Sequence, residues 1–318
     1  MPESRRPAWS RGASLDDIGA VLGLGSLADL SPEWAWGGAT GAGVRVALID
    51  SGVDAGHPAL EGCVDADAGV ALRLAPDGAV VAEPGPHEDL FGHGTACAEI
   101  IHRFVPEARI TSVRVLDARL GGRSAVFLHG LAWAAERGFD VINLSLGTGT
   151  RDWALAFYEV CDEAYFRNCV VVTAANNQAR ASYPSLYASV LSVACNAAAD
   201  PWRFHVNPEP PTEFLARGVN VDVAWRGGGR RVVTGNSFAA PHIAGLAALV
   251  RSKHRGLRPF QVKTVLWATA HNVRAAEAQA ARDAPVPPAR GGTAVFSLAD
   301  LMERYPELAA QPAPEAPR

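Results

Sequence analysis

The stretch Val44-Arg45-Val46-Ala47-Leu48-Ile49-Asp50 decides the fold class of this 318-residue chain. It is a short, mostly apolar run, rich in β-branched residues, and it ends in Asp-Ser-Gly. A run of this length without polar alternation predicts a strand that is buried on both faces, as in parallel sheets. The Ser-Gly pair that follows predicts a turn at the carboxyl end of the strand.

Strand-like and helix-like segments alternate along the rest of the chain. We predict further strands at residues 109–116, 140–144, 169–175, 190–194 and 219–223. We predict helices from His93 onward and at residues 124–137, 151–167, 237–253 and 259–270. Strands that alternate with helices of this length form βαβ units. The predicted fold is therefore α/β: a single domain with a parallel β-sheet core and helices on both faces.

The domain boundaries follow from where this pattern begins and ends. Residues 1–32 are weakly patterned and form a predicted N-terminal extension, and residues 33–273 form the predicted folded domain. The pattern is lost near the end, and the chain finishes with AAQPAPEAPR, so residues 274–318 are a predicted C-terminal extension that is partly disordered. Within the folded domain, the Gly- and Pro-rich residues 61–90 predict a loop with room for an edge hairpin.

The composition excludes several classes of protein. Hydrophobic residues make up 48% of the chain and charged residues 19%, so a disordered chain is excluded. The net charge is -4, with 29 basic and 33 acidic residues, which predicts no nucleic-acid partner and no anionic membrane partner. The sequence also has no run of about eighteen apolar residues that could span a membrane.

The cysteines and the first residues bear on location. The five cysteines are scattered and form no CxxC pair, which predicts free thiols in a reducing compartment. Arg5 and Arg6 form a twin arginine, but Asp16 and Asp17 interrupt the apolar run that an export signal needs. We therefore expect a cytoplasmic protein.

Three polar residues stand where a parallel sheet places active sites. Asp50 ends the first strand, His93 lies in the glycine-flanked turn FGHGT, and Ser237 lies in GNSFAAPH, a turn that opens a helix. Sites in open parallel sheets gather beyond the carboxyl ends of strands. A histidine can take the proton of a serine hydroxyl, and a carboxylate can orient that histidine. The three residues therefore predict nucleophilic catalysis.

An acyl-transfer reaction also needs hydrogen-bond donors for the oxyanion of its tetrahedral intermediate. The backbone N–H of Ser237 lies at a predicted helix N-terminus, where developing negative charge is favoured. Asn177 follows the predicted strand at residues 169–175 and can supply a side-chain amide. These two groups are the candidate oxyanion donors.

Five segments resemble those of the subtilase family of serine proteases. VALIDSGVDAGHPAL, from Val46, resembles the aspartate segment, and HGTACAEII, from His93, resembles the histidine segment. GNSFAAPHIAGLAALV, from Gly235, resembles the serine segment, while INLSLG and VVVTAANN resemble the substrate-pairing and oxyanion segments. The order Asp, His, Ser is the subtilisin order. The resemblance runs from about residue 30 to residue 271 and implies a subtilisin-like peptidase domain at residues 33–273.

The resemblance implies a catalytic role for four residues. Asp50 orients and stabilises the base, His93 acts as general base and then as general acid, and Ser237 is the nucleophile. Asn177 is the oxyanion donor, because it matches the asparagine of the family's Gly-Asn pair. The implied reaction is hydrolysis of a peptide bond through an acyl-enzyme, with a peptide or protein as substrate and with no cofactor.

The resemblance also implies five substrate-binding residues. Ser145, Leu146 and Gly147 would hydrogen-bond an extended peptide as an added strand. Gln178 and Ser182 would lie near the primary specificity pocket. This pocket has no clear charge, which indicates an apolar or modestly polar preference.

The chain departs from the family at several points. Gly235-Asn236-Ser237 stands where the family usually has Gly-Thr-Ser, whose threonine can support the oxyanion hole, and Asn176 replaces a glycine. In subtilisin a calcium-binding loop interrupts the helix after the histidine. The short spacing from His93 to Pro106 leaves no room for that loop, so we expect its calcium site to be missing. Tyr183-Pro184 matches a position with a cis proline in relatives, which predicts a cis bond here.

Other polar residues are predicted to be structural. His57 and His87 lack the spacing of metal ligands, so they are predicted turn residues and we expect no metal site. His242 is predicted to be a packed core histidine. Cys97, on the helix that starts at His93, is predicted to be a small buried residue close enough to the base to make activity sensitive to mercurials.

Three function hypotheses can be compared at this point. The first is an active serine endopeptidase; with no export signal and no room for a folding prodomain before Leu30, we expect it to process a peptide precursor inside the cell. The second is a pseudoprotease that binds an extended peptide without cleaving it, which is disfavoured because the three triad residues and Asn177 are all present. A nucleotide-binding protein is excluded, since no GxGxxG or P-loop motif follows a strand. The sequence sets no oligomeric state.

Overall fold

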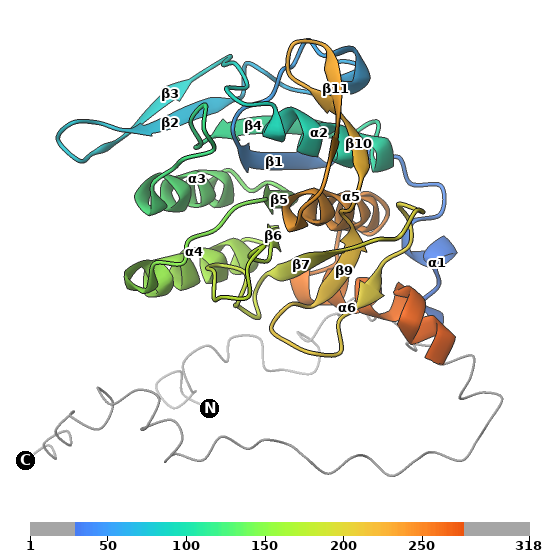
Figure 1. Cartoon of the computed structure of the whole chain (residues 1–318). Helices are drawn as coiled ribbons and strands as arrows, with labels where there is room; N and C mark the ends of the chain where they lie inside the picture. Colours follow the sequence, from blue (N-terminus) through green and yellow to red (C-terminus); the bar gives the residue numbers. More distant parts are fainter. Residues whose placement is uncertain (1–28, 277–318) are drawn as a thin grey trace, which may run out of the picture. The chain divides into compact units, whose positions relative to one another are not determined.

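The structure, a computed structural model, describes residues 29–276 (Figure 1). The predicted extensions at residues 1–32 and 274–318 therefore lie largely outside the described residues. The same holds for the predicted disorder of the C-terminal extension. The predicted folded domain, residues 33–273, lies entirely within the described part of the chain.

The run that decides the fold class forms β1 (Arg45–Asp50), in the middle of a nine-stranded sheet of order β3-β2-β4-β1-β5-β6-β7-β9-β8. Its other strands are β2 (Val70–Leu74), β3 (Val80–Pro84), β4 (Arg109–Arg114), β5 (Val141–Leu144), β6 (Val170–Ala174), β7 (Leu191–Asn196), β8 (His205–Val206) and β9 (Phe214–Arg217). Neighbouring strands are parallel except for β2–β3 and β8–β9 at the two edges. The predicted parallel sheet is confirmed, and the predicted edge hairpin is β2–β3.

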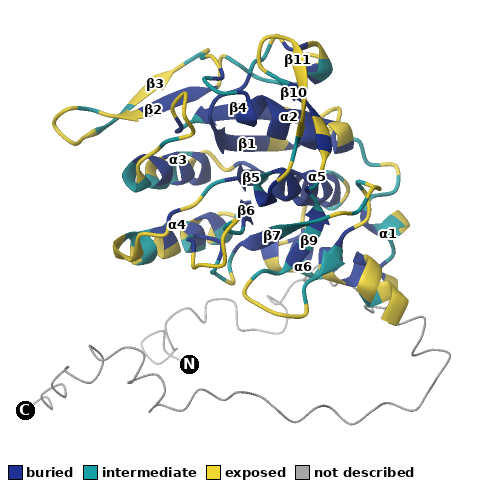
Figure 2. Ribbon diagram, in the orientation of Figure 1, coloured by how far each residue is buried: buried dark blue, intermediate teal, exposed yellow. Residues whose placement is uncertain are grey.

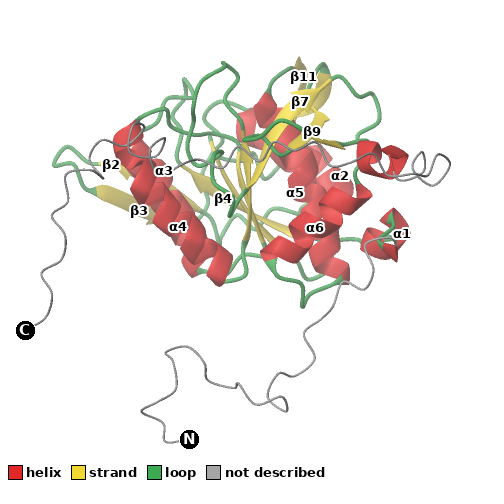
Figure 3. Cartoon of the chain, turned by 90° about the horizontal axis from the view of Figure 1, so that it is seen from below, coloured by secondary structure: helices red, strands yellow, loops and turns green. Residues whose placement is uncertain are grey.

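Helices cover both faces of the sheet (Figure 3). One face holds α3 (Ser124–Glu136) and α4 (Ala154–Phe166), and the other holds α2 (His93–Phe104), α5 (Asn236–Lys253) and α6 (Pro259–Thr269). The predicted layering is therefore confirmed. The described part of the chain also contains two 3₁₀ turns, η3 (Pro58–Leu60) and η4 (Arg151–Trp153), and a short helix, α1 (Pro32–Trp36).

Several short elements differ from the sequence prediction, which gave no strand for β8 or β9. Helix α1 was not predicted; the hydroxyl of Ser31 accepts a hydrogen bond from the N–H of Trp34 and caps it. The run predicted at residues 219–223 forms β10 (Val221–Trp225), which pairs antiparallel with β11 (Gly229–Val233) in a separate two-stranded sheet. Glycines with positive φ between these two strands allow the chain to reverse, and in the main sheet β9 is the strand that pairs with β7.

Helix α5 fixes the position of the candidate site, because it is buried along almost its whole length (Figure 2). Small side chains allow the close packing: a Cβ added to Gly245 would lie 2.8 Å from the Cβ of Phe104 in α2. A larger residue there would force the two helices apart. In residues 29–276 no helix combines the length and the apolar character that a membrane crossing needs.

Candidate active site

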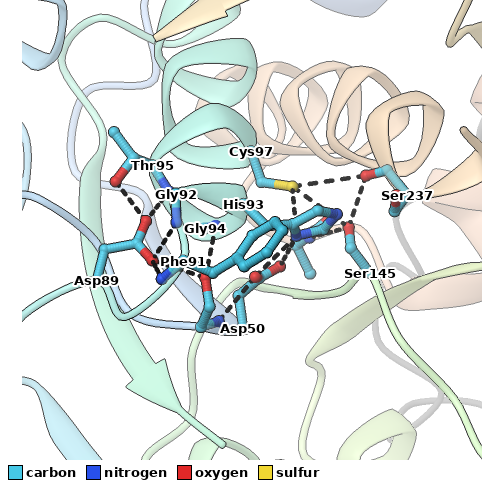
Figure 4. A network of polar contacts seen from close by, with 12 residues as sticks. Asp50, Asp89, Phe91, Gly92, His93, Gly94, Thr95, Cys97, Ser145 and Ser237 are labelled. Carbon is cyan, nitrogen blue, oxygen red and sulfur yellow. Dashed lines mark hydrogen bonds and ion pairs between the residues drawn. The ribbon is translucent and has the colours of Figure 1, made fainter. Parts of the chain in front are cut away.

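The predicted site residues meet at the carboxyl end of β1. Asp50 is the last residue of β1, His93 is the first residue of α2, and Ser237 is the second residue of α5. A cleft of about 290 Å³ is lined by His93, Ser237 and Asn177. The carboxylate of Asp50 contacts the ring of His93 without itself lining the cleft, and Figure 4 shows this contact. The fold thus brings together all four residues to which the resemblance gave catalytic roles.

Asp50 and His93 form a buried pair. The Nδ1 atom of His93 lies 2.8 Å and 2.9 Å from the two carboxylate oxygens of Asp50. The Asp50 side chain is 1% exposed and the His93 side chain 9%. The carboxylate holds the proton of a neutral ring on Nδ1 and leaves Nε2 as the acceptor. Burial by itself lowers the pKa of His93, but the charge and hydrogen bond of Asp50 outweigh it and raise this pKa well above its ordinary value.

The glycines on each side of His93 are required by the backbone geometry. Gly92 has a φ of 118°, in the left-handed region that favours glycine. A Cβ added to Gly94 would lie 1.9 Å from the carbonyl oxygen of Gly52, in the turn after β1. Helix α2 therefore begins directly against the end of β1, and this approach places the His93 ring beside Asp50.

Sequence reasoning missed Asp89, a buried carboxylate that organises the turn before His93 (Figure 4). Its two oxygens accept five hydrogen bonds of 2.6 to 3.0 Å, from the hydroxyl of Ser51, the backbone N–H groups of Phe91, Gly92 and Thr95, and the hydroxyl of Thr95. Asp89 therefore links the residue after Asp50 to the first turn of α2. An acidic residue four positions before His93 was the available signal, but its donors include Ser51, which is remote in the sequence.

Ser237 is half-buried and faces the cleft. In the described part of the chain, the His93 ring contacts Asp50 and Cys97 but makes no hydrogen bond with the Ser237 hydroxyl. Such catalytic hydrogen bonds are often long without substrate and tighten in the complex. The backbone of Ser237 is held firmly, since its carbonyl accepts a hydrogen bond of 2.9 Å from the hydroxyl of Ser145 (Figure 4).

Cys97 is fully buried, which confirms that prediction. Its Sγ atom lies 3.8 Å from Nδ1 of His93 and 3.5 Å from the carbonyl oxygen of Ser237. Burial raises the pKa of this thiol. Asp50, His93 and Cys97 offer ligand atoms within 4.8 Å of one another. Because Asp50 and His93 are already paired, a soft metal ion bound here would compete with that pair.

Asn177 lies at the mouth of the cleft with its side-chain oxygen engaged. Its Oδ1 atom accepts a hydrogen bond of 2.9 Å from the backbone N–H of Asn236, the residue before Ser237. The Nδ2 group is therefore the end of the amide that remains to donate to a ligand. This arrangement suits an oxyanion donor.

Four of the five predicted substrate-binding residues line the cleft: Ser145, Leu146, Gly147 and Ser182. Gln178 is exposed and lies outside the lining, so the structure does not bring it to the cleft. The lining also includes apolar residues that sequence reasoning missed, namely Leu116, Leu120 and Phe127, and it includes Ala174, Ala175 and Asn176 of the oxyanion segment. The predicted cis bond at Tyr183–Pro184, in the segment that follows Ser182, is present.

The three histidines predicted to be structural lie outside the cleft. His242 is 2% exposed and its Nδ1 donates to the carbonyl of Phe238, while burial lowers the pKa of its ring to about 4. The ring of His57 contacts backbone groups, and that of His87 contacts a backbone carbonyl and a serine hydroxyl. These contacts are of the kind that a structural histidine makes.

Comparison with known proteins agrees with this geometry. Residues 41–290 match the model of the Subtilase family. Subtilisin of Bacillus pumilus is 32% identical over 248 residues, a match that covers 73% of this chain and 86% of that protein. Subtilisin E of Bacillus subtilis (strain 168) is also 32% identical over 248 residues, and the match covers 73% of this chain and 62% of subtilisin E. A solved structure, a cold adapted subtilisin-like serine proteinase, has a TM-score of 0.58 at 25% identity and covers 74% of this chain and 87% of its own.

The fold and these matches define a protein of the subtilisin-like serine endopeptidase class. The chain belongs to the subtilase family. This confirms the resemblance inferred from the five sequence segments. It also confirms the predicted fold class.

Proposed function

We propose that the chain is an active serine endopeptidase that hydrolyses peptide bonds through an acyl-enzyme. One observation supports this most strongly: a single cleft is lined by His93, Ser237 and Asn177, with the free amide end of Asn177 available and with His93 paired to the buried Asp50. These four groups supply what peptide hydrolysis needs: a nucleophile, a base that passes the proton to the leaving amine, a carboxylate that orients the base, and a donor for the oxyanion.

In the proposed first step, the oxygen of Ser237 bonds to the carbonyl carbon of the peptide while its proton moves to Nε2 of His93. The resulting oxyanion accepts hydrogen bonds from Nδ2 of Asn177 and from the backbone N–H of Ser237. Collapse of this intermediate breaks the C–N bond, and the leaving amine takes the proton from His93. A water molecule then repeats the sequence and releases the acyl group from Ser237.

Asp50 has two roles in this proposal. Its carboxylate holds the ring of His93 in the tautomer that has Nε2 free, and it stabilises the imidazolium that forms after each proton transfer. The raised pKa of His93 is the direct expression of this stabilisation. Because Asp50 is buried with its oxygens held by neighbours, water does not screen the interaction.

The cleft supports binding of an extended, uncharged peptide segment. Ser145, Leu146 and Gly147 follow β5 and lie along the lining, where an added strand would pair with their backbone. The lining residues other than His93 are uncharged, and Leu116 and Phe127 give one end an apolar wall. We therefore propose a preference for apolar side chains on the acyl side, which mass spectrometry of the products of a peptide library would measure.

We further propose that the protein processes a peptide precursor inside the cell. The five cysteines are all free, and four of them are buried, which supports a compartment that keeps thiols reduced. Fractionation of cells with an antibody against the chain tests the location. Recovery of the protein in the culture medium or in a membrane fraction would contradict this part of the proposal.

A fluorophosphonate probe tests the catalytic proposal. We expect the probe to label the wild-type protein and to leave Ser237→Ala unlabelled, with loss of peptide hydrolysis in the same variant. Circular dichroism of both proteins provides the control for folding. A folded wild-type protein that binds peptides but neither reacts with the probe nor cleaves them would instead be a pseudoprotease, the alternative function of this cleft.

A further inference from the structure

Asn236 stands between a glycine and the nucleophile and is almost buried, at 9% exposure. It is the first residue of α5, and its side chain points away from solvent into the junction of three chain segments. These segments are the end of β6, the strand β7 and the N-terminus of α5. The polar atoms of its side chain therefore form hydrogen bonds with neighbouring protein groups and not with water.

The side-chain amide of Asn236 is fully occupied by backbone partners. Its Nδ2 group donates to the carbonyl of Ala175 at 3.2 Å and to that of Asn176 at 3.0 Å. Its Oδ1 atom accepts from the N–H of Cys195, in β7, at 2.8 Å. A primary amide has two N–H donors, so neither remains for a ligand in the cleft.

The backbone of the same residue holds the oxyanion asparagine. The N–H of Asn236 donates to Oδ1 of Asn177 at 2.9 Å. Asn236 thus holds Asn177 in place in two ways. Its side chain bonds the two backbone carbonyls that precede Asn177, and its backbone N–H bonds the side-chain oxygen of Asn177. Its own peptide bond to Ser237 ties the same residue to the nucleophile.

We propose that Asn236 is a positioning residue that sets the distance between the oxyanion donor and the nucleophile. The inference rests on the proposed function and deepens it, because it assigns one residue to the alignment of Asn177 with Ser237. Asn236 does not itself touch the oxyanion, since its donors are already used. It acts on the transition state through Asn177, whereas substrate binding in the ground state does not depend on it.

Kinetics of Asn236→Ala test the proposal. A misplacement of about 1 Å at a reacting centre can cost about 10²-fold in rate. We expect kcat for a peptide substrate to fall by about 10 to 100-fold while KM changes by less than about 3-fold. The affinity of a peptidyl boronic acid, whose tetrahedral adduct places an oxygen at the oxyanion position, should fall by the same factor as kcat.

Asn207 provides a matched control. Its side chain makes the same kind of contacts, with Nδ2 donating to two backbone carbonyls and Oδ1 accepting one N–H, but it lies in the loop between β8 and β9. Asn207→Ala should lower the Tm without changing kcat. If both alanine variants reduced kcat to the same extent, a general loss of stability would explain the effect and the proposal would be wrong.

A double-mutant cycle separates action through Asn177 from an independent effect. In an Asn177→Ala background, Asn236→Ala should cost less than about 3-fold in kcat, because the donor that it positions is already gone. A loss in this background as large as in the wild type would overturn the proposal.

Asn236→Asp covers the case in which Asn236→Ala does not fold. A carboxylate keeps the oxygen that accepts from Cys195 but has no N–H group for either carbonyl, so we expect kcat to fall by about 10-fold or more. A folded Asn236→Asp or Asn236→Ala protein with wild-type kcat overturns the inference and leaves the proposed function intact. A wild-type protein that shows neither turnover nor fluorophosphonate labelling overturns the proposed function, and this inference with it.

Discussion

The two sides of the cleft are built in different ways. On the base side, Asp50 and His93 are buried, paired through their charges and supported by a carboxylate, Asp89, whose oxygens accept five hydrogen bonds. On the oxyanion side, Asn177 is exposed. Its amide oxygen accepts from the backbone N–H of Asn236, and the side chain of Asn236 bonds the two carbonyls that precede Asn177. Charge and burial fix the base, whereas neutral hydrogen bonds fix the oxyanion donor. Damage to the base side should therefore cost more activity.

The largest expected effect follows replacement of the buried carboxylate. Asp50→Asn removes the charge that holds and stabilises His93 while keeping the shape, so we expect kcat to fall by about 10⁴-fold. The measurement is steady-state hydrolysis of a fluorogenic peptide. A loss below about 10-fold would show that the charge of Asp50 is not part of the mechanism.

The same variant has a pH signature. His93 must be neutral to act as a base, so activity is present above its pKa and is lost as the pH falls through it. Asp50 holds this pKa well above 6.5, and the acid limb of the wild-type kcat/KM profile should lie correspondingly high. In Asp50→Asn, burial remains and the charge is gone, so the limb should move to lower pH. An unmoved limb would contradict the assignment.

The next largest effect belongs to the oxyanion side. Asn177→Ala removes one donor, and in subtilisin, a relative of this chain, loss of one oxyanion donor lowers kcat by about 10² to 10³-fold. We expect a change of this order with KM almost unchanged. Gln178→Ala is the neighbouring control, because Gln178 is exposed and outside the cleft lining. Equal losses in the two variants would count against Asn177 as the donor.

Asp89 allows a test of how the base side is supported. In Asp89→Asn an N–H₂ group replaces one carboxylate oxygen and cannot accept from the N–H groups that bond this oxygen in the wild type. We therefore expect a loss of about 2 to 3 kcal/mol in the free energy of unfolding. Urea unfolding followed by circular dichroism measures it. Asp117→Asn is the control, since Asp117 accepts two backbone N–H groups in an exposed turn and should change stability little. Similar losses in both variants would contradict the role of Asp89.

The smallest effect on activity is expected for Cys97→Ala without any treatment, because it removes a thiol that the reaction does not use. The variant should differ from the wild type only when both are treated with a mercurial. Mercury bound to Sγ would lie against Nδ1 of His93, 3.8 Å away, and disrupt its pairing with Asp50, so we expect inhibition of the wild type. Cys97→Ala should retain activity under the same treatment. Inhibition of both proteins would point to another cysteine.

Much of the fold could be predicted because its signals are local. The apolar run ending at Asp50 and the alternation after it indicated the sheet and the helices, and α3 and α5 lie within one residue of their expected ends. The strand at residues 219–223 was placed in the main sheet, whereas it pairs with the segment that follows it in a separate hairpin. Its partner β11 has the mostly polar sequence GRRVV, which carries no strand signal.

The candidate site shows the same limit. Asp50, His93 and Ser237 could be identified because each lies in a short motif whose glycines are required by close backbone approach, as at Gly94. Asp89 and Asn236 could not be assigned from their motifs, since each bonds a group that is remote in the sequence, namely Ser51 for Asp89 and Ala175 and Cys195 for Asn236. The apolar lining residues Leu116 and Phe127 were missed for the same reason.

Trapping the acyl-enzyme tests the central claim most directly. The protein is mixed with a peptide ester, quenched in acid within milliseconds and digested with pepsin, and the peptide that contains Ser237 is weighed by mass spectrometry. The account predicts that this peptide gains the mass of the acyl group in the wild type and that the gain is absent in Ser237→Ala. Hydrolysis without any acyl adduct, or with the acyl group on another residue such as Cys97, would contradict it.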